Sequence, residues 1–396
     1  MTETRTGPRP LAGLRVLDFT MIMSGPFCTR MLADLGAEVI KVEPPAGDQI
    51  RGRPPARGDG HSTYFGQLNC GKRSIVLDLR TVEGADVARR LAASSDVVVE
   101  NYRPGVMSRL GLGYETLSVD NPRLVFCSIS GFGQTGPDAG RAAYAPIIHA
   151  ASGYDMANLQ YQDDADTPGR TGIFIADVLG AVYAFGAIQT ALLHRERSGV
   201  GQFVDVALMD GMLSMLVFEA QEAQFPTERR RPVYAPVRTT DGFVVVAPVS
   251  ERLFEKLCDV VGSPQWRTDP RFATIEQREQ HWDTLTGLVE EWTSRRSAAE
   301  CEKILTDAGL PCSRYRTVGE AIADPQVLHR GALATVTDPA GEFAVPQQPF
   351  RFSAVSVGAG SGVPALGAAG PDILREVLDL DDGAIEALRV SGALGR

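Results

Sequence analysis

Short apolar runs alternate with amphipathic stretches over the first third of the chain. The runs are rich in Val, Ile and Leu and lie at residues 14–19, 37–43, 74–79, 96–100 and 124–130. Each has the length and composition of a buried strand. Helical spacing marks the stretches that begin at Ser24 and at Val82, with Ser24 and Thr81 as expected N-caps. Strands that alternate with helices at this spacing predict a doubly wound α/β domain whose sheet begins parallel.

One much longer apolar stretch lies at residues 172–193 and reads GIFIADVLGAVYAFGAIQTALL. Asp177 and Gln189 are its strongly polar exceptions. A helix that is apolar on every side is either central in a large protein or a membrane span. The chain has no second stretch of this kind and its mean hydropathy is -0.06. We therefore predict a buried central helix and no membrane partner.

Asp177 is out of place in such a helix. A carboxylate in apolar surroundings is costly to desolvate, so it must be paired, neutralised or kept for a chemical use. The alternative is a first-turn acid that the free N–H groups and the helix dipole stabilise. The pattern by itself leaves both interpretations open.

The second half of the chain has a different pattern. Residues 225–236, FPTERRRPVYAP, are charged and Pro-rich and indicate a linker. A hairpin signal at Asp241-Gly242 and three amphipathic helices follow, at residues 251–261, 281–294 and 298–308. We predict a first large domain over residues 1–222 and a smaller α+β domain over 226–330. Residues 345–396 end in two helices and are expected to return to the large domain.

Composition excludes several classes of function. The 396 residues carry a net charge of -10, which argues against a nucleic-acid binder. The six cysteines and five histidines form no ligand-spaced cluster, so we expect no metal site and a reducing compartment. The first residues, MTETRTGPRPLAGLRVLDF, contain no apolar signal-peptide core. These features together predict a cytoplasmic protein.

Loops at the carboxyl ends of the predicted strands are where open α/β sheets bind ligands. Here these are residues 20–26, 101–104 and 131–137. The third begins GFGQTG, the spacing of a dinucleotide fingerprint, but Pro137 follows at once and no apolar helix opens there. We therefore predict no nicotinamide or flavin site, and interpret the run as a place of close backbone approach to a ligand.

Residues 44–60, PPAGDQIRGRPPARGDG, form a long loop that contains Arg51, Arg53 and Arg57. A loop of this length without its own structure is usually functional or mobile. The alternative is a solvated surface loop.

Eight motifs, in order and over nearly the whole chain, resemble those of the family III CoA-transferases, also called the CaiB/BaiF family. They are LxGLRVLDFTxxxSGP at residues 11–26, GAEVIKVEPP at 36–45, NxGKRS at 69–74, VENYRPG at 99–105, GFGQTGP at 131–137, ADVLG at 176–180, GxGQxVDVALxD at 199–210 and DPRFAT at 269–274. The resemblance implies a Rossmann-like large domain with an inserted smaller α+β domain. It also implies a homodimer in which two subunits interlock like links of a chain.

The resemblance assigns catalysis to Asp177. Its carboxylate is expected to attack a donor acyl-CoA, giving an aspartyl anhydride and then an aspartyl-CoA thioester, from which an acceptor carboxylic acid takes the CoA. No permanently bound cofactor and no metal is needed. Each step passes through an oxyanion, which requires positioned N–H donors.

The resemblance also assigns binding residues. The positions expected to bind CoA are Met23, Ser24, Leu68, Asn69, Lys72, Asn101, Tyr102, Arg103 and Arg109. Lys72, Arg103 and Arg109 would supply cations for the phosphates. The candidate oxyanion or substrate loop comprises Gly131, Gly133, Gln134 and Tyr144.

Two departures bear on the substrate. Oxalate-using members have a glutamine where this chain has Met23, and a glycine-rich loop that is missing from residues 226–278. Both absences argue against formyl-CoA:oxalate exchange and for a larger or less polar acid.

Two other functions remain as alternatives. Racemases of the same fold use a His-Asp pair for proton transfer, which here falls on Tyr144 and Ala145, while His149 is off register and expected to be a packed core residue. A non-catalytic CoA-binding protein is the other alternative, and the intact Asp177 argues against it.

Overall fold

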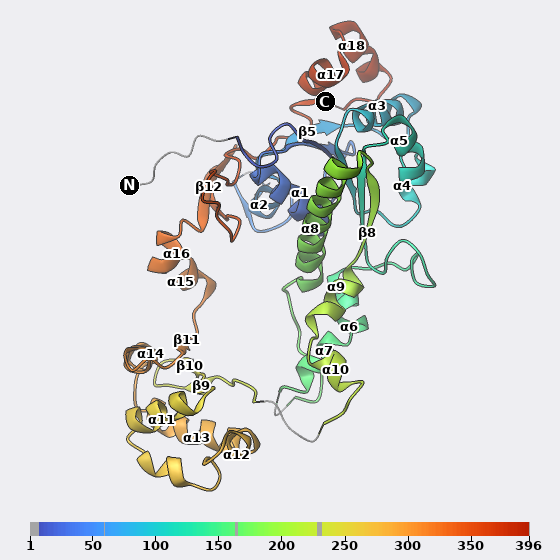
Figure 1. Cartoon of the computed structure of the whole chain (residues 1–396). Helices are drawn as coiled ribbons and strands as arrows, with labels where there is room; N and C mark the ends of the chain where they lie inside the picture. The colour runs from blue at the N-terminus through green and yellow to red at the C-terminus, as the bar shows by residue number, and fades with distance from the viewer. Residues whose placement is uncertain (1–7, 59, 163–164, 228–231, 396) are drawn as a thin grey trace. The chain divides into compact units, whose positions relative to one another are not determined.

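The computed structural model divides the chain into two compact units (Figure 1), and it describes residues 8–58, 60–162, 165–227 and 232–395. Unit 1 comprises Met1–Val217 and His329–Arg396, and unit 2 comprises Phe218–Leu328. The first division falls a few residues before the expected boundary at 222–226. The second division places residues 331–344 in unit 1, whereas the sequence pattern assigns them to neither domain.

Unit 1 is built on a six-stranded sheet in the order β5-β2-β1-β6-β7-β8. The strands are β1 (Arg15–Asp18), β2 (Glu38–Glu43), β5 (Arg73–Val76), β6 (Val97–Glu100), β7 (Val125–Ser130) and β8 (Gln202–Ala207). Every neighbouring pair is parallel, which confirms the sheet predicted from the strand spacing.

Helices cover both faces of this sheet, which is why its strands are continuous apolar runs. The helices are α1 (Ser24–Asp34) and α8 (Ile175–Ser198) on one face, and α3 (Val82–Ala93), α5 (Tyr114–Asp120), α17 (Gly370–Leu378) and α18 (Asp382–Val390) on the other. Successive strand residues enter opposite cores. Val16 packs in the core with α1 and α8, and Leu17 in the core with α3 and α17.

The C-terminal segment is fastened to the edge of the sheet. The Asp78 N–H donates to the carbonyl of Ala393 at 2.9 Å, and the Gly395 N–H donates to the carbonyl of Val76 at 3.1 Å. The return of the last helices to unit 1 therefore protects the outer side of the edge strand β5.

The α8 helix is buried on one side only, which corrects the expectation of a wholly buried helix. One side packs against α1, α9 (Leu208–Met215) and β8. On the other side Val182, Tyr183 and Leu193 are about half exposed, at 47%, 47% and 55%. Length and composition would also let this helix cross a membrane. Its packed side nevertheless contributes to the larger core of unit 1.

Shorter elements complete unit 1. They are β3 (Ala56–Arg57), β4 (His61–Ser62), α2 (Thr63–Asn69), α4 (Val106–Arg109), α6 (Ala145–Ala151), α7 (Tyr154–Leu159), and the hairpin of β12 (Leu333–Asp338) with β13 (Gly341–Pro346). No helix opens directly after residues 131–136, because α6 begins only at Ala145. This local structure agrees with the rejection of a dinucleotide fingerprint.

Unit 2 has a small antiparallel sheet in the order β11-β10-β9 and several helices. Its elements are α10 (Glu219–Glu222), β9 (Val237–Arg238), β10 (Phe243–Val246), α11 (Glu251–Val260), a 3-10 helix (Pro264–Thr268), α12 (Ile275–Gln280), α13 (Trp282–Thr293), α14 (Ala298–Asp307), β11 (Cys312–Arg314) and α15 (Val318–Ile322), with α16 (Pro325–His329) at the junction. One apolar cluster, centred on Phe254, Leu257 and Phe272, forms its core.

Candidate functional site

Asp177 lies in the first turn of α8, at the end that follows the loop to Phe174. Both the hydroxyl and the backbone N–H of Ser24 hydrogen-bond to its carboxylate. Burial raises the pKa of Asp177 to about 6, and the two hydrogen bonds from Ser24 partly oppose that rise. At neutral pH the group is therefore an ionised, poorly solvated carboxylate, which is the state a nucleophile needs.

His149 supplies the cap that the start of α8 otherwise lacks. Phe174, the residue before the helix, makes no side-chain cap. Instead, Nε2 of the buried His149 accepts the N–H of Ala176 at 3.2 Å. Burial lowers the pKa of His149, which keeps this nitrogen an acceptor. The histidine is buried as expected, but its contact with the residue beside Asp177 was not predicted.

The loop that carries Ser24 has an uncommon backbone. Ile22 has a φ of +70°, in the left-handed region that a β-branched residue rarely adopts. Asn101 holds Met21 on both sides, accepting its N–H at 2.9 Å and donating to its carbonyl at 2.8 Å. The Asp48 carboxylate accepts the Ile22 N–H at 3.3 Å. These contacts fix a strained turn that aims Ser24 at Asp177.

Two fully buried ion pairs lie beneath this loop. Lys41 contacts Asp48 at 3.0 Å and donates to the carbonyl of Thr20 at 2.7 Å. Lys72 contacts Asp18 at 3.0 Å and also donates to Thr29 Oγ1 at 2.8 Å. Burial lowers the pKa of Lys72 to about 8, although Asp18 opposes that shift.

This network includes several of the residues that are expected to bind CoA. The Lys72 ammonium is enclosed by Asp18, Pro26, Thr29 and Asn69, so it is not presented to a phosphate. Asn69 and Leu68 are buried as well. The side-chain amide of Asn101 is hydrogen-bonded to the backbone of Met21. Their CoA-binding role therefore stays a prediction from motif position.

Arg103 and Arg109, by contrast, are exposed beyond the carboxyl end of β6. Within the described residues no ion pair or hydrogen bond engages the side chain of either arginine, so both guanidinium groups remain available for phosphate. The backbone N–H of the neighbouring Tyr102 donates a hydrogen bond to the Glu100 carboxylate at 2.8 Å. Burial raises the pKa of Glu100 to about 7 and that of the Tyr102 phenol to about 12.

In the Gly-rich loop at residues 131–136, one backbone N–H donor is already hydrogen-bonded within the protein. Gly133 has a φ of +87°, and the following Gln134 N–H donates to the Asp205 carboxylate at 3.0 Å. The Gly131 carbonyl accepts the N–H of Met209. The donors that reach Asp177 come from Ser24 instead, which the sequence assigned only to CoA binding.

A cleft of about 430 Å³ lies near the start of α8, which carries Asp177. Its lining includes Ile22 from the strained loop, Tyr64, Tyr144 and Phe174, which lies three residues before Asp177. The Asp177 carboxylate and burial together raise the pKa of the Tyr64 phenol to about 12, burial being the larger cause. Tyr144, an expected site residue, is thus placed at the cleft, and Met23 packs nearby against a small cluster around Phe65.

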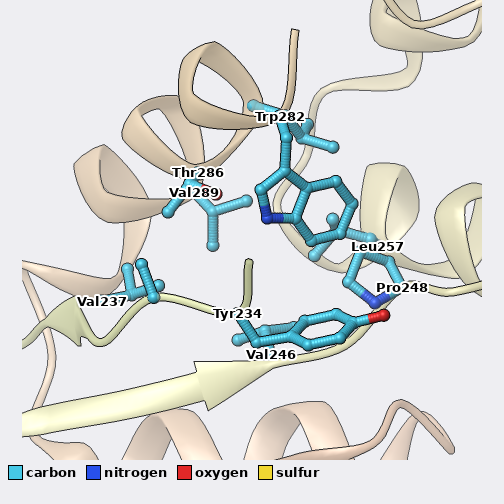
Figure 2. Close-up of a pocket in the computed structure, with 10 residues that line it drawn as sticks. Tyr234, Val237, Val246, Pro248, Leu257, Trp282, Thr286 and Val289 are labelled. Atoms are coloured by element: carbon cyan, nitrogen blue, oxygen red, sulfur yellow. The ribbon is translucent and has the colours of Figure 1, made fainter. Parts of the chain in front are cut away.

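Unit 2 contains a second, much smaller cavity (Figure 2). It measures about 20 Å³, with room for roughly one water molecule. Tyr234 and Trp282 meet edge to face at one side of it, with Val246 and Leu257 nearby. Its size and apolar lining make it a packing gap rather than a substrate site.

Comparison with known proteins identifies the chain's relatives. Residues 11–369 match the family described as CoA-transferase family III. The chain belongs to CoA-transferase family III. It is 34% identical to the succinyl-CoA:glutarate CoA-transferase of Mus musculus, over 98% of this chain and 90% of the relative. It is 36% identical to the succinyl-CoA--D-citramalate CoA-transferase of Chloroflexus aurantiacus (strain ATCC 29366 / DSM 635 / J-10-fl), over 96% and 97%.

A solved structure of a CAIB/BAIF family protein from Brucella suis superposes on this CoA-transferase with a TM-score of 0.82. It covers 94% of this chain and 100% of its own, at 36% identity. The substrates are therefore a CoA thioester and a carboxylic acid. In the part of the chain that the structure describes, no group of three or more His, Cys, Asp or Glu side chains could hold a metal ion.

Proposed function

We propose that this CoA-transferase uses Asp177 as a covalent nucleophile. The Asp177 carboxylate attacks the carbonyl carbon of a donor acyl-CoA, the C–S bond breaks, and CoA leaves as a thiolate with an aspartyl anhydride remaining. The thiolate then attacks the Asp177 carbonyl and displaces the donor carboxylate, giving an aspartyl-CoA thioester. An acceptor carboxylate repeats the two steps in reverse and leaves as its CoA thioester.

The contact of Ser24 with Asp177 carries this proposal. A tetrahedral oxyanion forms on the Asp177 carbonyl each time CoA or an acid attacks it. The Ser24 hydroxyl and N–H already hydrogen-bond to this carboxyl group. Donors fixed by a strained, multiply held turn need no rearrangement as charge develops, and such donors lower a barrier most effectively.

CoA binding is proposed to involve the exposed cations. Arg103 and Arg109 lie at the carboxyl end of β6, where ligands bind in open α/β sheets. Their guanidinium groups suit the pyrophosphate and the 3′-phosphate of CoA. Ser24 and Tyr102 remain candidate contacts on neighbouring loops, and Met23 a packing contact. Lys72, Asn69, Asn101 and Leu68 are proposed to act indirectly, by holding the loop.

We propose further that the active form is a cytoplasmic, interlocked homodimer with unit 2 as an inserted domain. The exposed apolar side of α8, with Val182, Tyr183 and Leu193, supports the dimer. A contiguous apolar helix face in a water-soluble protein is typical of an interface.

Trapping tests the covalent mechanism. The enzyme is incubated with acetyl-CoA, succinyl-CoA, a branched acyl-CoA and an aryl-acyl-CoA in turn, and hydroxylamine is then added. Hydroxylamine displaces CoA or the acid from an activated Asp177 and leaves a hydroxamate, which peptide mass spectrometry locates. We expect the modification on the peptide that contains Asp177, with at least one donor.

Two variants act as controls. Asp177→Ala should lose the hydroxamate and reduce transfer by about 10³-fold or more. Asp210→Ala removes another first-turn acid, one that is exposed on α9, and should keep both. Normal transfer by Asp177→Ala would refute the covalent route. Deuterium uptake at the α-carbon in heavy water, with no hydroxamate, would favour a racemase instead.

A further inference from the structure

The three arginines of the loop at residues 44–60 have different partners. Arg51 forms an ion pair with Glu43 at 2.6 Å and stacks 3.9 Å above the ring of Phe65. Arg57 forms an ion pair with Asp338 at 2.6 Å. Within the described residues no ion pair or hydrogen bond engages the Arg53 side chain, although its backbone N–H donates to the carbonyl of Ile50 at 3.1 Å. Two of the arginines therefore hold the loop in place, and one keeps an uncompensated charge.

Arg53 is exposed and contributes to the lining of the cleft near Asp177. Among the described residues that line the 430 Å³ cleft, it is the only charged one. The other lining residues are apolar or neutral, including Ile50, Pro54 and the phenol-bearing Tyr64 and Tyr144. Nearby charges do not neutralise it, because Asp48 is buried against Lys41. The cleft thus offers one cation in a largely apolar space.

We propose that Arg53 binds the second carboxylate of an aliphatic dicarboxylic acid whose first carboxylate reacts at Asp177. This inference rests on the proposed function, because the acyl chain must lie in the cleft while its carbonyl carbon is bonded to the Asp177 side chain. The guanidinium presents paired N–H donors that match a carboxylate. The aliphatic segment between the two carboxylates contacts the apolar lining, with Phe174 next to the reacting end.

Discrimination follows from the same arrangement. An acid with an apolar tail would cover Arg53 and remove its water without supplying a hydrogen-bond acceptor. A site that is built to pair a polar group rejects an analogue that lacks this group, because its own polar atoms are left unpaired. Sequence comparison with oxalate-using members suggested a larger or less polar acid. The cleft supports a larger one, and Arg53 requires that its far end be anionic.

Isotopic self-exchange is the test, because each reaction then uses one acid as both donor and acceptor. Succinyl-CoA is mixed with ¹³C-labelled succinate, and butyryl-CoA with ¹³C-labelled butyrate. Mass spectrometry follows the label entering the CoA thioester. The two acids have the same number of carbons and differ in the second carboxylate. We expect the wild-type kcat/KM to favour the succinyl pair by about 10- to 100-fold.

Variants identify the residue responsible. Arg53→Gln should abolish most of this preference while leaving butyryl exchange unchanged or faster. Arg53→Lys should restore part of it. Arg57→Gln is the matched control, since it removes the same charge from the same loop but from a residue outside the cleft lining, and it should keep the preference.

The outcomes separate the two proposals. Exchange of both acids at similar rates in the wild type would overturn the role of Arg53 and leave the covalent mechanism standing. An equal loss of both exchanges in Arg53→Gln, with a raised KM for both thioesters, would also overturn it and indicate a CoA phosphate contact. Absence of any exchange or hydroxamate in the wild type would overturn the mechanism and, with it, this inference.

Discussion

The two units bury charge in different ways. Beneath the Met21–Ser24 turn, unit 1 encloses two ion pairs, Lys41–Asp48 and Lys72–Asp18, whose side chains are fully buried. Unit 2 relies on an apolar core, and its buried Arg278 reaches an exposed partner, Glu251.

Buried ion pairs add little net stability compared with apolar packing. Their presence under a strained turn next to Asp177 therefore indicates a positioning role. The apolar core of unit 2 needs no such arrangement.

The largest expected effect comes from breaking a pair in unit 1. Lys72→Met leaves Asp18 buried without its ammonium partner, and should reduce the free energy of unfolding by about 3–5 kcal/mol. Chemical denaturation measures the change. Lys303→Met removes the exposed pair with Asp307 in unit 2 and should have no measurable effect. Similar losses in the two variants would refute the contrast between the units.

The next prediction concerns Asp177, a buried carboxylate that no cation pairs among the described residues, and what its burial costs in folding stability. Its pKa is raised from 3.8 to about 6 in the folded protein, so the folded state binds the proton more tightly than the unfolded state does. Stability from this group is therefore present at low pH and is lost as pH rises from about 4 through 6. Asp177→Asn should stabilise the protein by about 1–3 kcal/mol at pH 7.5.

Denaturation at two pH values provides the control. At pH near 4 both the carboxyl and the amide are neutral, and the difference between Asp177→Asn and the wild type should nearly vanish. The transfer rate of the wild type should also fall as pH drops below about 6, because the proposed nucleophile, Asp177, becomes protonated. A stabilisation independent of pH would contradict this account.

A smaller effect on protein stability is expected at His149. Here the loss of stability can be separated from the effect on the position of Asp177. His149→Ala removes the acceptor for the Ala176 N–H and should destabilise the protein by about 0.5–2 kcal/mol, the range for a lost helix cap. The kcat should fall more than KM changes, because the helix end that carries Asp177 loses its anchor. His149→Gln can still accept this N–H and should recover much of kcat.

The smallest effect is expected in unit 2. Ser297 begins α14 with a capping box, in which its side chain accepts from the Glu300 N–H and Glu300 accepts from Ser297. Ser297→Ala should lower the free energy of unfolding by about 1 kcal/mol and leave transfer rates unchanged. A marked loss of transfer would mean that unit 2 contributes directly to the site.

The elements that local chemistry determines could be predicted from the sequence. Helix α3 covers Val82–Ala93, and the expected cap, Thr81, accepts the Gly84 N–H. The parallel strands followed from their apolar runs. The burial of individual side chains could not be predicted. Lys72 and Asn69 belong to a recognisable motif, but motif spacing does not indicate on which side of a loop a side chain lies.

Two further features needed the fold. In the sequence, an apolar residue that packs inside its own chain looks the same as one that stays exposed for a partner. The sequence pattern therefore does not predict the exposed side of α8. The role of Ser24 was also underestimated. Its contact with Asp177 joins segments far apart in the chain, and their proximity is a property of the parallel sheet rather than of either motif.

The pairing of residues 393–395 with Val76 and Asp78 has a consequence for biosynthesis. Unit 2 is one continuous segment, so every part of its core is available once residues 218–328 have left the ribosome. The sheet of unit 1 cannot close its β5 edge until the segment at the opposite end of the sequence has emerged. During translation the unit that carries Asp177 therefore keeps an open strand edge until residues 393–395 have been made.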